Sequence, residues 1–359
     1  MFVHCKKGEE QVNPPQFNNL EEEIDYYAGK YLHVGLVVGI IDKDQQKSVF
    51  SYGSKNTSVI DPPDENTVFE IGSITKSFTC LLAWQFMLSG LFNNELAQSY
   101  LPADITLPVK GNTHISLYHL ATHTSGIPGS PRDDAAQLPS TYSSVNPYAA
   151  FTTDYMYDYF TNQCNLLSVP GEAWRYSNSG MGLLGHIIGL CDSSSYENVL
   201  QREVFDELEM ENSSLFLTPQ QKENYATGYD KNLTQLTEFT AQDIFQGAGF
   251  IKSSLADMFK YLEAQMGLSE TSLRQAMEDC QQPQFELDYW GSQCFGWYKK
   301  TLSDGQHITY CGGNTLGFGS YIGFNKSLST GVILWYNADF DDGANLILGP
   351  VILKAINKY

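Results

Sequence analysis

The sequence predicts a protein of the α/β (α+β) class, with one antiparallel sheet flanked by terminal helices and interrupted by an inserted, mostly helical domain. Strand-like segments lie near both ends of the chain, at residues 33–53 and 294–336, whereas helical patterns dominate between them. Because both groups of strands have apolar faces to bury, one shared sheet is the economical arrangement. We expect the following division: a polar N-terminal arm over residues 1–16, a sheet domain over 17–75 and 206–359, and an inserted helical domain over 76–205.

The N-terminal part is expected to form a helix and then a hairpin. Three glutamates stand in the first turn, where the helix dipole favours acids, and apolar residues recur at helical spacing: Phe17, Leu20, Ile24 and Tyr27. Residues 33–41 are short and rich in β-branched side chains, and a polar turn joins them to a second strand at 47–53. A further helix should follow Ser73 and stop near Gly90.

The middle of the chain carries several helix start signals. Asn146 and Pro147 are expected to open one helix, because proline is favoured at the first helical position. Residues 180–190 should form another, after the loop that ends at Tyr176. Ser194, answered by Glu197, offers a capping box ahead of a further apolar run.

The C-terminal part combines a helix start with a return to strands. Ser254 and Asp257 predict another capped helix. Aromatic and β-branched segments separated by short turns then predict a meander of strands at residues 294–301, 307–313, 319–324 and 330–336. A last helix is expected at 344–357.

Composition and charge exclude several functional classes. Of the 359 residues, 42% are hydrophobic and 17% are charged, so the chain is globular and not disordered. A formal charge of −20 repels nucleic acids and anionic lipid head groups, and no run of 18 apolar residues is present to span a bilayer. We expect neither as a partner. Monomer and dimer both remain open.

The cysteines and the first residues bear on the compartment. Seven cysteines are scattered without a C-x-x-C pair, which excludes a zinc ribbon and a dense disulfide framework but leaves one disulfide open: Cys5, Cys80, Cys164, Cys191, Cys280, Cys294 and Cys311. The first residues lack the apolar core of a signal peptide. The protein is expected to be cytoplasmic if Met1 is the natural start, and periplasmic or secreted if a leader precedes this sequence.

The most specific local feature is Ser73, three residues before Lys76 at the start of a helix. This spacing puts the hydroxyl and the amine on one helix face, close enough to share a proton. A serine becomes an effective nucleophile when a base removes its proton, and lysine can be that base if burial or nearby cations lower its pKa. The helix N-terminus also offers amide N–H groups to a developing oxyanion. The alternative is a serine cap followed by a solvated lysine.

A second feature is the loop that carries Arg175, Tyr176 and Asn178. A tyrosine on a rigid loop can carry a proton if a cation such as Lys76 or Arg175 favours its phenolate, and an asparagine can hold a substrate amide from both ends. The alternative is a purely structural loop. A rival match over residues 196–198 falls in a capped first helical turn, where surface exposure and capping explain the polar groups better.

A third feature is the run Cys311, Gly312, Gly313 and Asn314. Paired glycines at a strand edge let a ligand approach the backbone, so that the N–H and C=O groups of the strand become the recognition element. A β-bulge or a tight turn is the alternative.

Histidines suggest a metal site only weakly. His119 and His123 stand four residues apart, with His114 nearby, as two zinc ligands on a helix would. The residues between them supply no glutamate base, and Gly126 ends the helix soon after. Buried, hydrogen-bonded histidines are therefore favoured over a metal site.

The order of the three features resembles the serine β-lactamase and penicillin-binding-protein superfamily. The resemblance is strongest to its class C β-lactamase-like branch, which includes D-alanyl-D-alanine carboxypeptidases, D-aminopeptidases and esterases. There a Ser-x-x-Lys motif opens a helix, a Tyr-x-Asn motif lies on a loop, and a Lys/His-x-Gly triad lies on a sheet edge. Ser73, Tyr176 and Cys311 keep this order, and similar phrases occur at residues 67–73, 120–128, 170–171 and 247–249. The resemblance covers residue 20 to the C-terminus and implies a β-lactamase/transpeptidase-like fold.

The resemblance also implies a covalent mechanism. Ser73 would attack a carbonyl and become acylated, while Lys76 and Tyr176 share the transfer of its proton to the leaving group, with the division between them open. Asn178 would hold an amide or carbonyl oxygen of the substrate. The oxyanion would bind the backbone N–H groups of Ser73 and Asn314, and water would release the acyl group. The resemblance implies that neither a metal nor an organic cofactor is needed.

One residue departs from the family pattern. Cys311 stands where β-lactamases and transpeptidases carry lysine, and many relatives histidine, so the cation expected to meet a substrate carboxylate is missing. The loss of such a contact removes about 1.5–3 kcal/mol of binding free energy.

The departure shapes the expected function. We expect a serine acyl-hydrolase that is an esterase or a peptidase/amidase and not an efficient β-lactamase. Its substrate would be a small molecule or peptide with an ester, amide or lactam carbonyl, neutral or cationic in keeping with the acidic surface. The alternatives are a class C-type β-lactamase or D-alanyl-D-alanine carboxypeptidase and, in another class, a non-catalytic binding protein on the same fold.

Overall fold

The computed structural model describes residues 15–134, 136–288, 290–338 and 343–359. Most of the expected N-terminal arm, residues 1–14, and Cys5 with it, lie outside these ranges. The six cysteines that are described are free, and no described helix is long and apolar enough to cross a membrane.

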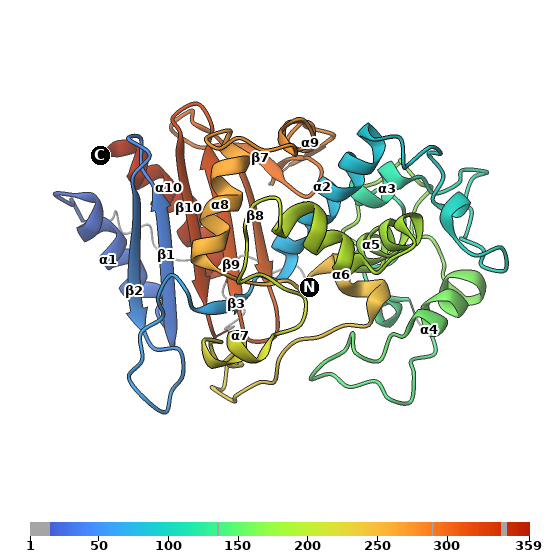
Figure 1. Cartoon of the computed structure of the whole chain (residues 1–359), viewed down its shortest axis with the longest axis horizontal. Helices are drawn as coiled ribbons and strands as arrows, with labels where there is room; N and C mark the ends of the chain where they lie inside the picture. Colours follow the sequence, from blue (N-terminus) through green and yellow to red (C-terminus); the bar gives the residue numbers. More distant parts are fainter. Residues whose placement is uncertain (1–14, 135, 289, 339–342) are drawn as a thin grey trace.

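One antiparallel sheet unites the two ends of the chain, which confirms the predicted architecture (Figure 1). Its strand order is β2-β1-β10-β9-β8-β7-β6-β5. The expected strands are β1 (Gly35–Ile41), β2 (Lys47–Gly53), β7 (Tyr298–Thr301), β8 (His307–Asn314), β9 (Gly319–Asn325) and β10 (Thr330–Tyr336). Sequence patterns do not indicate the three-residue strands β5 (Phe285–Leu287) and β6 (Gly291–Gln293), or a separate pair, β3 (Val68–Glu70) with β4 (Lys252–Ser254).

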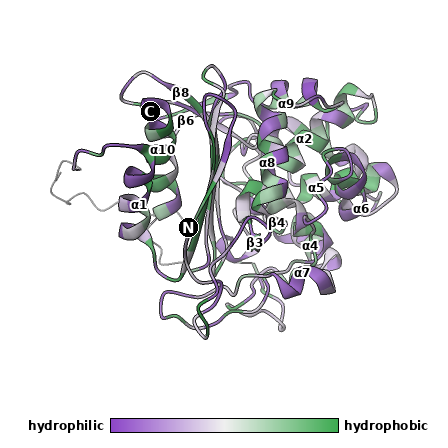
Figure 2. Cartoon of the chain, turned by 60° about the vertical axis from the view of Figure 1, so that its left-hand side comes forward, coloured by the Kyte–Doolittle hydropathy of each residue, from purple (hydrophilic) through white to green (hydrophobic). Residues whose placement is uncertain are grey.

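The sheet is covered on both faces, as Figure 2 shows with the strands nearly edge-on. Helices α1 (Leu20–Tyr31) and α10 (Ala344–Lys358) lie on one side, and α8 (Leu255–Met266) lies on the other. Strand β1 is buried along its whole length, because Val38 packs in the cluster that contains α1 and α10 while Val37 packs in the cluster that contains α8. Burying such a side chain contributes about 1.5–3 kcal/mol, so both faces stabilise the strand.

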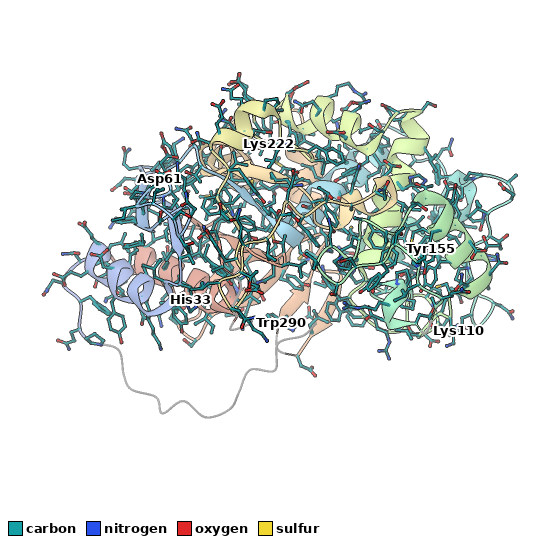
Figure 3. All side chains as sticks on the ribbon, turned by 90° about the horizontal axis from the view of Figure 1, so that it is seen from below. His33, Asp61, Lys110, Tyr155, Lys222 and Trp290 are labelled. Atoms are coloured by element: carbon teal, nitrogen blue, oxygen red, sulfur yellow. The ribbon has the colours of Figure 1, made fainter. Side chains whose placement is uncertain are left out.

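Helices of the middle of the chain pack beside the sheet. They are α2 (Thr75–Leu88), α3 (Leu117–Ala121), α4 (Thr153–Asp158), α5 (Asn178–Asp192), α6 (Tyr196–Leu200), α7 (Pro219–Glu223) and α9 (Arg274–Cys280). Short 3₁₀ turns cover Gly72–Ile74, Ala97–Tyr100, Pro131–Asp133 and Asp243–Ala248, and π-helical turns cover Tyr159–Gln163 and Gln201–Phe205. In Figure 3, Lys110 and Tyr155 of this helical part lie at the opposite end of the molecule from His33 and Asp61, which border the β1–β2 hairpin.

Several predicted helix starts are confirmed. Asn19 caps α1 by accepting from the Glu22 N–H at 2.9 Å, and three glutamates occupy the first turn. Ser254 caps α8 in the same way, accepting from Asp257. Ser177 caps α5, so the helix begins at Asn178.

Two predicted starts are wrong. No helix opens at Pro147: residues 147–150 form a turn, and α4 begins at Thr153, where the Thr152 hydroxyl accepts from the Tyr155 N–H. The turn lets the Tyr148 ring pack against Phe245 and Phe250, with ring centroids 4.9 and 5.6 Å apart respectively.

The second wrong start concerns α6. Ser195, and not Ser194, caps this helix, by accepting from the Asn198 N–H at 3.1 Å. Tyr196 is fully buried and not surface-exposed, and its hydroxyl lies 2.7 Å from the Thr79 hydroxyl on α2.

Candidate active site

The site is built around Ser73, in the 3₁₀ turn that leads into α2. The Lys76 ammonium donates to the Ser73 Oγ at 2.9 Å, and the Tyr176 hydroxyl donates to the same oxygen at 2.6 Å. Lys76 also donates to the carbonyl of Ala248, and its Nζ lies 4.7 Å from the centroid of the Tyr176 ring. Two side chains, one from the next turn of the chain and one 103 residues away, thus converge on the Ser73 hydroxyl oxygen.

Burial controls the protonation of both partners of Ser73. It lowers the pKa of Lys76 to about 7, although the nearby Cys80 and Cys311 thiols oppose the shift. It raises the pKa of Tyr176 above its ordinary value, opposed by the hydrogen bond to Ser73. Near neutral pH the lysine can therefore lose its proton, whereas the tyrosine remains a phenol.

The loop around Tyr176 is held in place by hydrogen bonds to the buried His123. The N–H of Arg175 donates to the His123 carbonyl at 2.7 Å, and the N–H of Ser177 donates to the His123 Nδ1 at 3.2 Å. The His123 ring also lies 4.5 Å from the Tyr176 ring, centroid to centroid. Burial first, and the charge of Lys76 second, lower the pKa of His123 to about 3, so the ring stays neutral and can accept. Arg175 itself is exposed.

His119 takes part in a helix cap. The Nδ1 of His119 accepts from the Ser116 N–H at 3.2 Å, which closes the cap of α3. Within the described ranges, no three His, Cys, Asp or Glu side chains gather closely enough to hold a metal ion.

Asn178 lies in the wall of the cleft at the first position of α5. Its Nδ2 donates to the Tyr148 hydroxyl at 2.9 Å. Its Oδ1 is buried and accepts no hydrogen bond from any described residue. Tyr148 is a residue of the site that sequence analysis missed, because it falls in a segment for which the pattern predicts a helix.

The C-terminal half of β8 lies against the turn that carries Ser73. A Cβ atom on Gly313 would stand 2.3 Å from the Ile71 carbonyl oxygen and 2.5 Å from the Ser73 nitrogen, so only glycine permits this approach. Ser320 ties the two segments by donating to the carbonyls of Ile71 and Gly313, at 2.8 and 3.1 Å. The backbones of Ser73 and Asn314 are therefore close neighbours.

Residues 311–314 are expected at an edge of the sheet, and the structure shows a different kind of edge. Strand β8 is not at the edge of the sheet, since β9 and β7 flank it. However, β7 pairs with β8 only as far as Tyr310, which leaves residues 311–314 free to face the Ser73 turn.

Cys311 is buried and is not among the residues that line the cleft. Its side chain is buried beside Ser77 and Lys76 of α2, and burial raises the pKa of the thiol. Neither Cys311 nor Gly312 lines the cleft, whereas Asn314 does. At this position the protein presents a neutral, buried thiol.

A cleft of about 340 Å³ opens in front of Ser73. Its helical side is lined by Ser130, Arg132, Tyr142, Pro147, Tyr148, Phe151 and Asn178. The remaining lining comes from Phe239, Ala248, Gly249, Phe250, Asn314, Thr315, Leu316, Gly343 and Leu346. Arg132 and most of the aromatic residues were not identified from the sequence, because only the folded chain brings these scattered residues together.

Comparison with known families matches residues 20–355 to the family model "Beta-lactamase". A protein of Pseudomonas fluorescens named "Beta-lactamase" is 25% identical, over 90% of this chain and 94% of that protein. A "Beta-lactamase" of Escherichia coli (strain K12) is 24% identical, over 90% of this chain and 89% of that protein.

Solved structures show the same fold. One is named a beta-lactamase/D-alanine carboxypeptidase from Pseudomonas syringae; it has a TM-score of 0.79 and 22% identity, covering 93% of this chain and 98% of that one. Another, named a class C beta-lactamase, has a TM-score of 0.79 and 23% identity, covering 93% and 96%.

Proposed function

The chain belongs to the beta-lactamase family of serine hydrolases, and from this premise we propose that it cleaves esters through a covalent acyl-enzyme on Ser73, in preference to β-lactams. The observation that carries the proposal is the convergence of Lys76 and Tyr176 on the Ser73 Oγ, at 2.9 and 2.6 Å. An isolated surface serine has no such partners.

The proposed reaction has two half-reactions. The neutral Lys76 amine accepts the Ser73 proton as Oγ attacks the ester carbonyl, and the N–H groups of Ser73 and Asn314 stabilise the oxyanion. The C–O bond to the leaving group then breaks, and the proton passes through Lys76 and Tyr176 to the departing alcohol. In the second half-reaction water gives a proton to the same pair and attacks the acyl carbon. The bond between the acyl carbon and the Ser73 Oγ then breaks, Oγ takes the proton back from the pair, and the carboxylic acid leaves.

The position of the substrate follows from the walls of the cleft. We place the acyl chain along the wall formed by Tyr148 and Asn178, where Asn178 can hold its oxygen atoms. The leaving group then points toward β8 and Tyr176, where the proton is delivered. At the β8 side the buried Cys311 thiol supplies no charge for a leaving-group carboxylate, which supports a preference for neutral leaving groups.

A β-lactamase or a D-alanyl-D-alanine carboxypeptidase is the second candidate. It is supported by the names of the relatives and by the name of the Pseudomonas syringae enzyme. β-Lactams and D-alanyl-D-alanine peptides would both present a carboxylate to the β8 side. The second candidate therefore requires that a carboxylate is accepted there, whereas the first predicts a preference for neutral leaving groups.

Mass spectrometry tests the acyl-enzyme directly. The protein is incubated with a fluorophosphonate, with a 4-nitrophenyl ester and with a penicillin, and the modified peptide is sequenced. We expect an adduct on Ser73 that is absent in Ser73→Ala and retained in Ser89→Ala, a matched control at the other end of α2. An unmodified Ser73 under all three probes would contradict the proposal and favour a non-catalytic binding protein. Faster turnover of the penicillin than of the ester would favour the second candidate.

A further inference from the structure

Arg132 is the only charged side chain in the cleft lining, among the residues that the structure describes. Its presence contrasts with the net charge of −20 of the whole chain. The average charge of a protein does not determine the potential inside a cleft, because nearby charges dominate there. One side of the cleft therefore carries a positive charge, on Arg132.

The backbone holds Arg132 in a fixed relation to Asn178. Arg132 lies on the 3₁₀ turn Pro131–Asp133, directly after a buried segment. The carbonyl of Pro128 accepts from the Ser177 hydroxyl at 2.9 Å, and the carbonyl of Gly129 accepts from the Ser179 N–H at 3.0 Å. These two bonds tie the segment to the N-terminus of α5. The turn that carries Arg132 thus stands beside the Asn178 end of α5, and the Arg132 side chain, which lines the cleft, is 54% exposed.

Two phenols accompany the guanidinium. The Tyr142 hydroxyl accepts from Arg132, which raises the pKa of the arginine. Tyr148 holds Asn178 through its hydroxyl oxygen, so its own proton is available to a ligand. Burial raises the pKa of Tyr148, which keeps that proton in place.

The neighbouring acid engages Arg132 only weakly. The Oδ1 of Asp133 lies 4.0 Å from the Arg132 Nε, and its Oδ2 accepts from the Ser130 hydroxyl at 2.9 Å. Since a guanidinium has five N–H donors, several remain for a ligand.

We propose that the group of Arg132, Tyr142 and Tyr148 binds a carboxylate carried on the acyl part of the substrate. This inference rests on the proposed function and deepens it. The substrates it selects are half-esters of dicarboxylic acids: the acyl chain ends in a carboxylate near Arg132, and the leaving group is uncharged. In the family pattern the cation at position 311 meets a carboxylate on the leaving-group side of the reacting carbonyl. Here the cation is Arg132, and it meets a carboxylate on the acyl side.

Matched 4-nitrophenyl esters of adipic acid test the proposal. One ends in a free carboxylate and the other in the isosteric carboxamide, and both release the same phenol. Since a charge-assisted hydrogen bond strengthens binding by about ten- to hundredfold, we expect kcat/KM to favour the carboxylate by about that factor. The preference should disappear in Arg132→Gln and survive in part in Arg132→Lys.

Controls separate local recognition from the general charge of the protein. Arg202→Gln removes one positive charge from an exposed pair with Asp192 and should leave the preference unchanged. The hexanoate esters of 4-hydroxybenzoic acid and of 4-hydroxybenzamide place the same pair of groups on the leaving side, where we expect no preference for the carboxylate. Equal kcat/KM for the two adipate esters, or an unchanged preference in Arg132→Gln, would overturn the proposal.

Equilibrium binding keeps this outcome distinct from failure of the proposed function. Calorimetric titration of Ser73→Ala with the unreacted esters measures recognition without chemistry, and the carboxylate should bind about tenfold or more tightly than the carboxamide. Equal affinities would refute the carboxylate site even if Ser73 is acylated. Preferential binding without acylation of the unaltered protein would refute the acyl-enzyme and leave the site standing.

Discussion

At the residue scale, the structure bears on how Lys76 and Tyr176 divide the proton transfer. Both side chains contact the Ser73 Oγ, but burial lowers the pKa of Lys76 to about 7 and raises that of Tyr176. A base must be unprotonated before it can act, so the lysine amine is available at neutral pH and the phenolate is not. A cation at position 311 would favour the phenolate, whereas the neutral Cys311 thiol does not.

This division predicts the pH dependence of ester hydrolysis. If neutral Lys76 is the base, kcat/KM for an uncharged ester should fall about tenfold per unit below pH 7. Cys311→Lys places a like charge beside Lys76, which lowers the pKa of Lys76 further, so the acid limb should move to lower pH. Cys311→Ala is the uncharged control and should move the limb much less. Rates from pH 5 to 10 measure this, and a limb near the ordinary lysine pKa of about 10.4 would contradict it.

At the element scale, the meeting of β8 with the Ser73 turn creates the oxyanion site. Gly313 sits so close to the turn that no side chain can be accommodated, and Ser320 and Asn345 brace the strand. The Asn345 Nδ2 donates to the carbonyls of Gly313 and Ser320, at 3.1 and 2.8 Å. Two backbone N–H groups from different elements can therefore be aimed at one point.

Gly313→Ala should separate the two elements. Its Cβ would meet backbone atoms that cannot rotate away, so the strand must shift from Ser73. Since one oxyanion donor is worth about 10²–10³ in kcat, we expect at least about a 100-fold loss with the protein still folded. Gly29→Ala is the matched control, because a Cβ at this position in α1 meets nothing within 4 Å. Equal activities of the two variants in ester hydrolysis would show that close backbone approach is not required.

At the scale of the whole molecule, a buried ion network joins the small β3–β4 sheet to the cleft wall. Lys252 is fully buried, with its ammonium 3.1 Å from Glu238 and donating to the carbonyls of Leu215 and Phe239 at 2.8 and 2.9 Å. Glu70 accepts from the Phe239 N–H at 2.7 Å and from the Tyr225 hydroxyl at 2.6 Å. Burial lowers the pKa of Lys252 and raises that of Glu70, and their mutual attraction opposes both shifts.

Lys252→Met should destabilise the protein strongly. It removes the charge partner of the buried Glu70 and of the partly exposed Glu238, and the donor to two carbonyls, which costs about 3–5 kcal/mol in comparable buried pairs. Lys47→Met is the matched control: its pair with Glu263 has a lysine side chain that is 46% exposed, so the loss should stay below about 1 kcal/mol. Urea denaturation measures both free energies of unfolding. Similar losses in the two variants would show that burial does not set the strength of this network.

Local signals explain which elements were predictable. The first helix with its acidic first turn, the cap at Ser254 and the β1–β2 hairpin follow from residues adjacent in sequence. The signals failed where contacts distant in sequence decided the outcome. Packing of Tyr148 against Phe245 and Phe250 replaces a helix at Pro147 with turns, and the contact of Tyr196 with Thr79 accompanies a cap at Ser195.

The sequence by itself determined the order of the chemistry-bearing residues, Ser73 with Lys76, Tyr176 with Asn178 and the glycines after Cys311, because covalent spacing and local pattern carry that information. Only the tertiary structure decided that Tyr148 holds Asn178, that the Cys311 thiol is buried beside α2, and that Arg132 faces the cleft. The charge of −20 illustrates the difference. This charge is a sum over the whole chain, and taken alone it favours neutral or cationic substrates. The field that a substrate meets depends instead on the few charges that folding brings to the cleft. Among the described lining residues the charged side chain is that of Arg132.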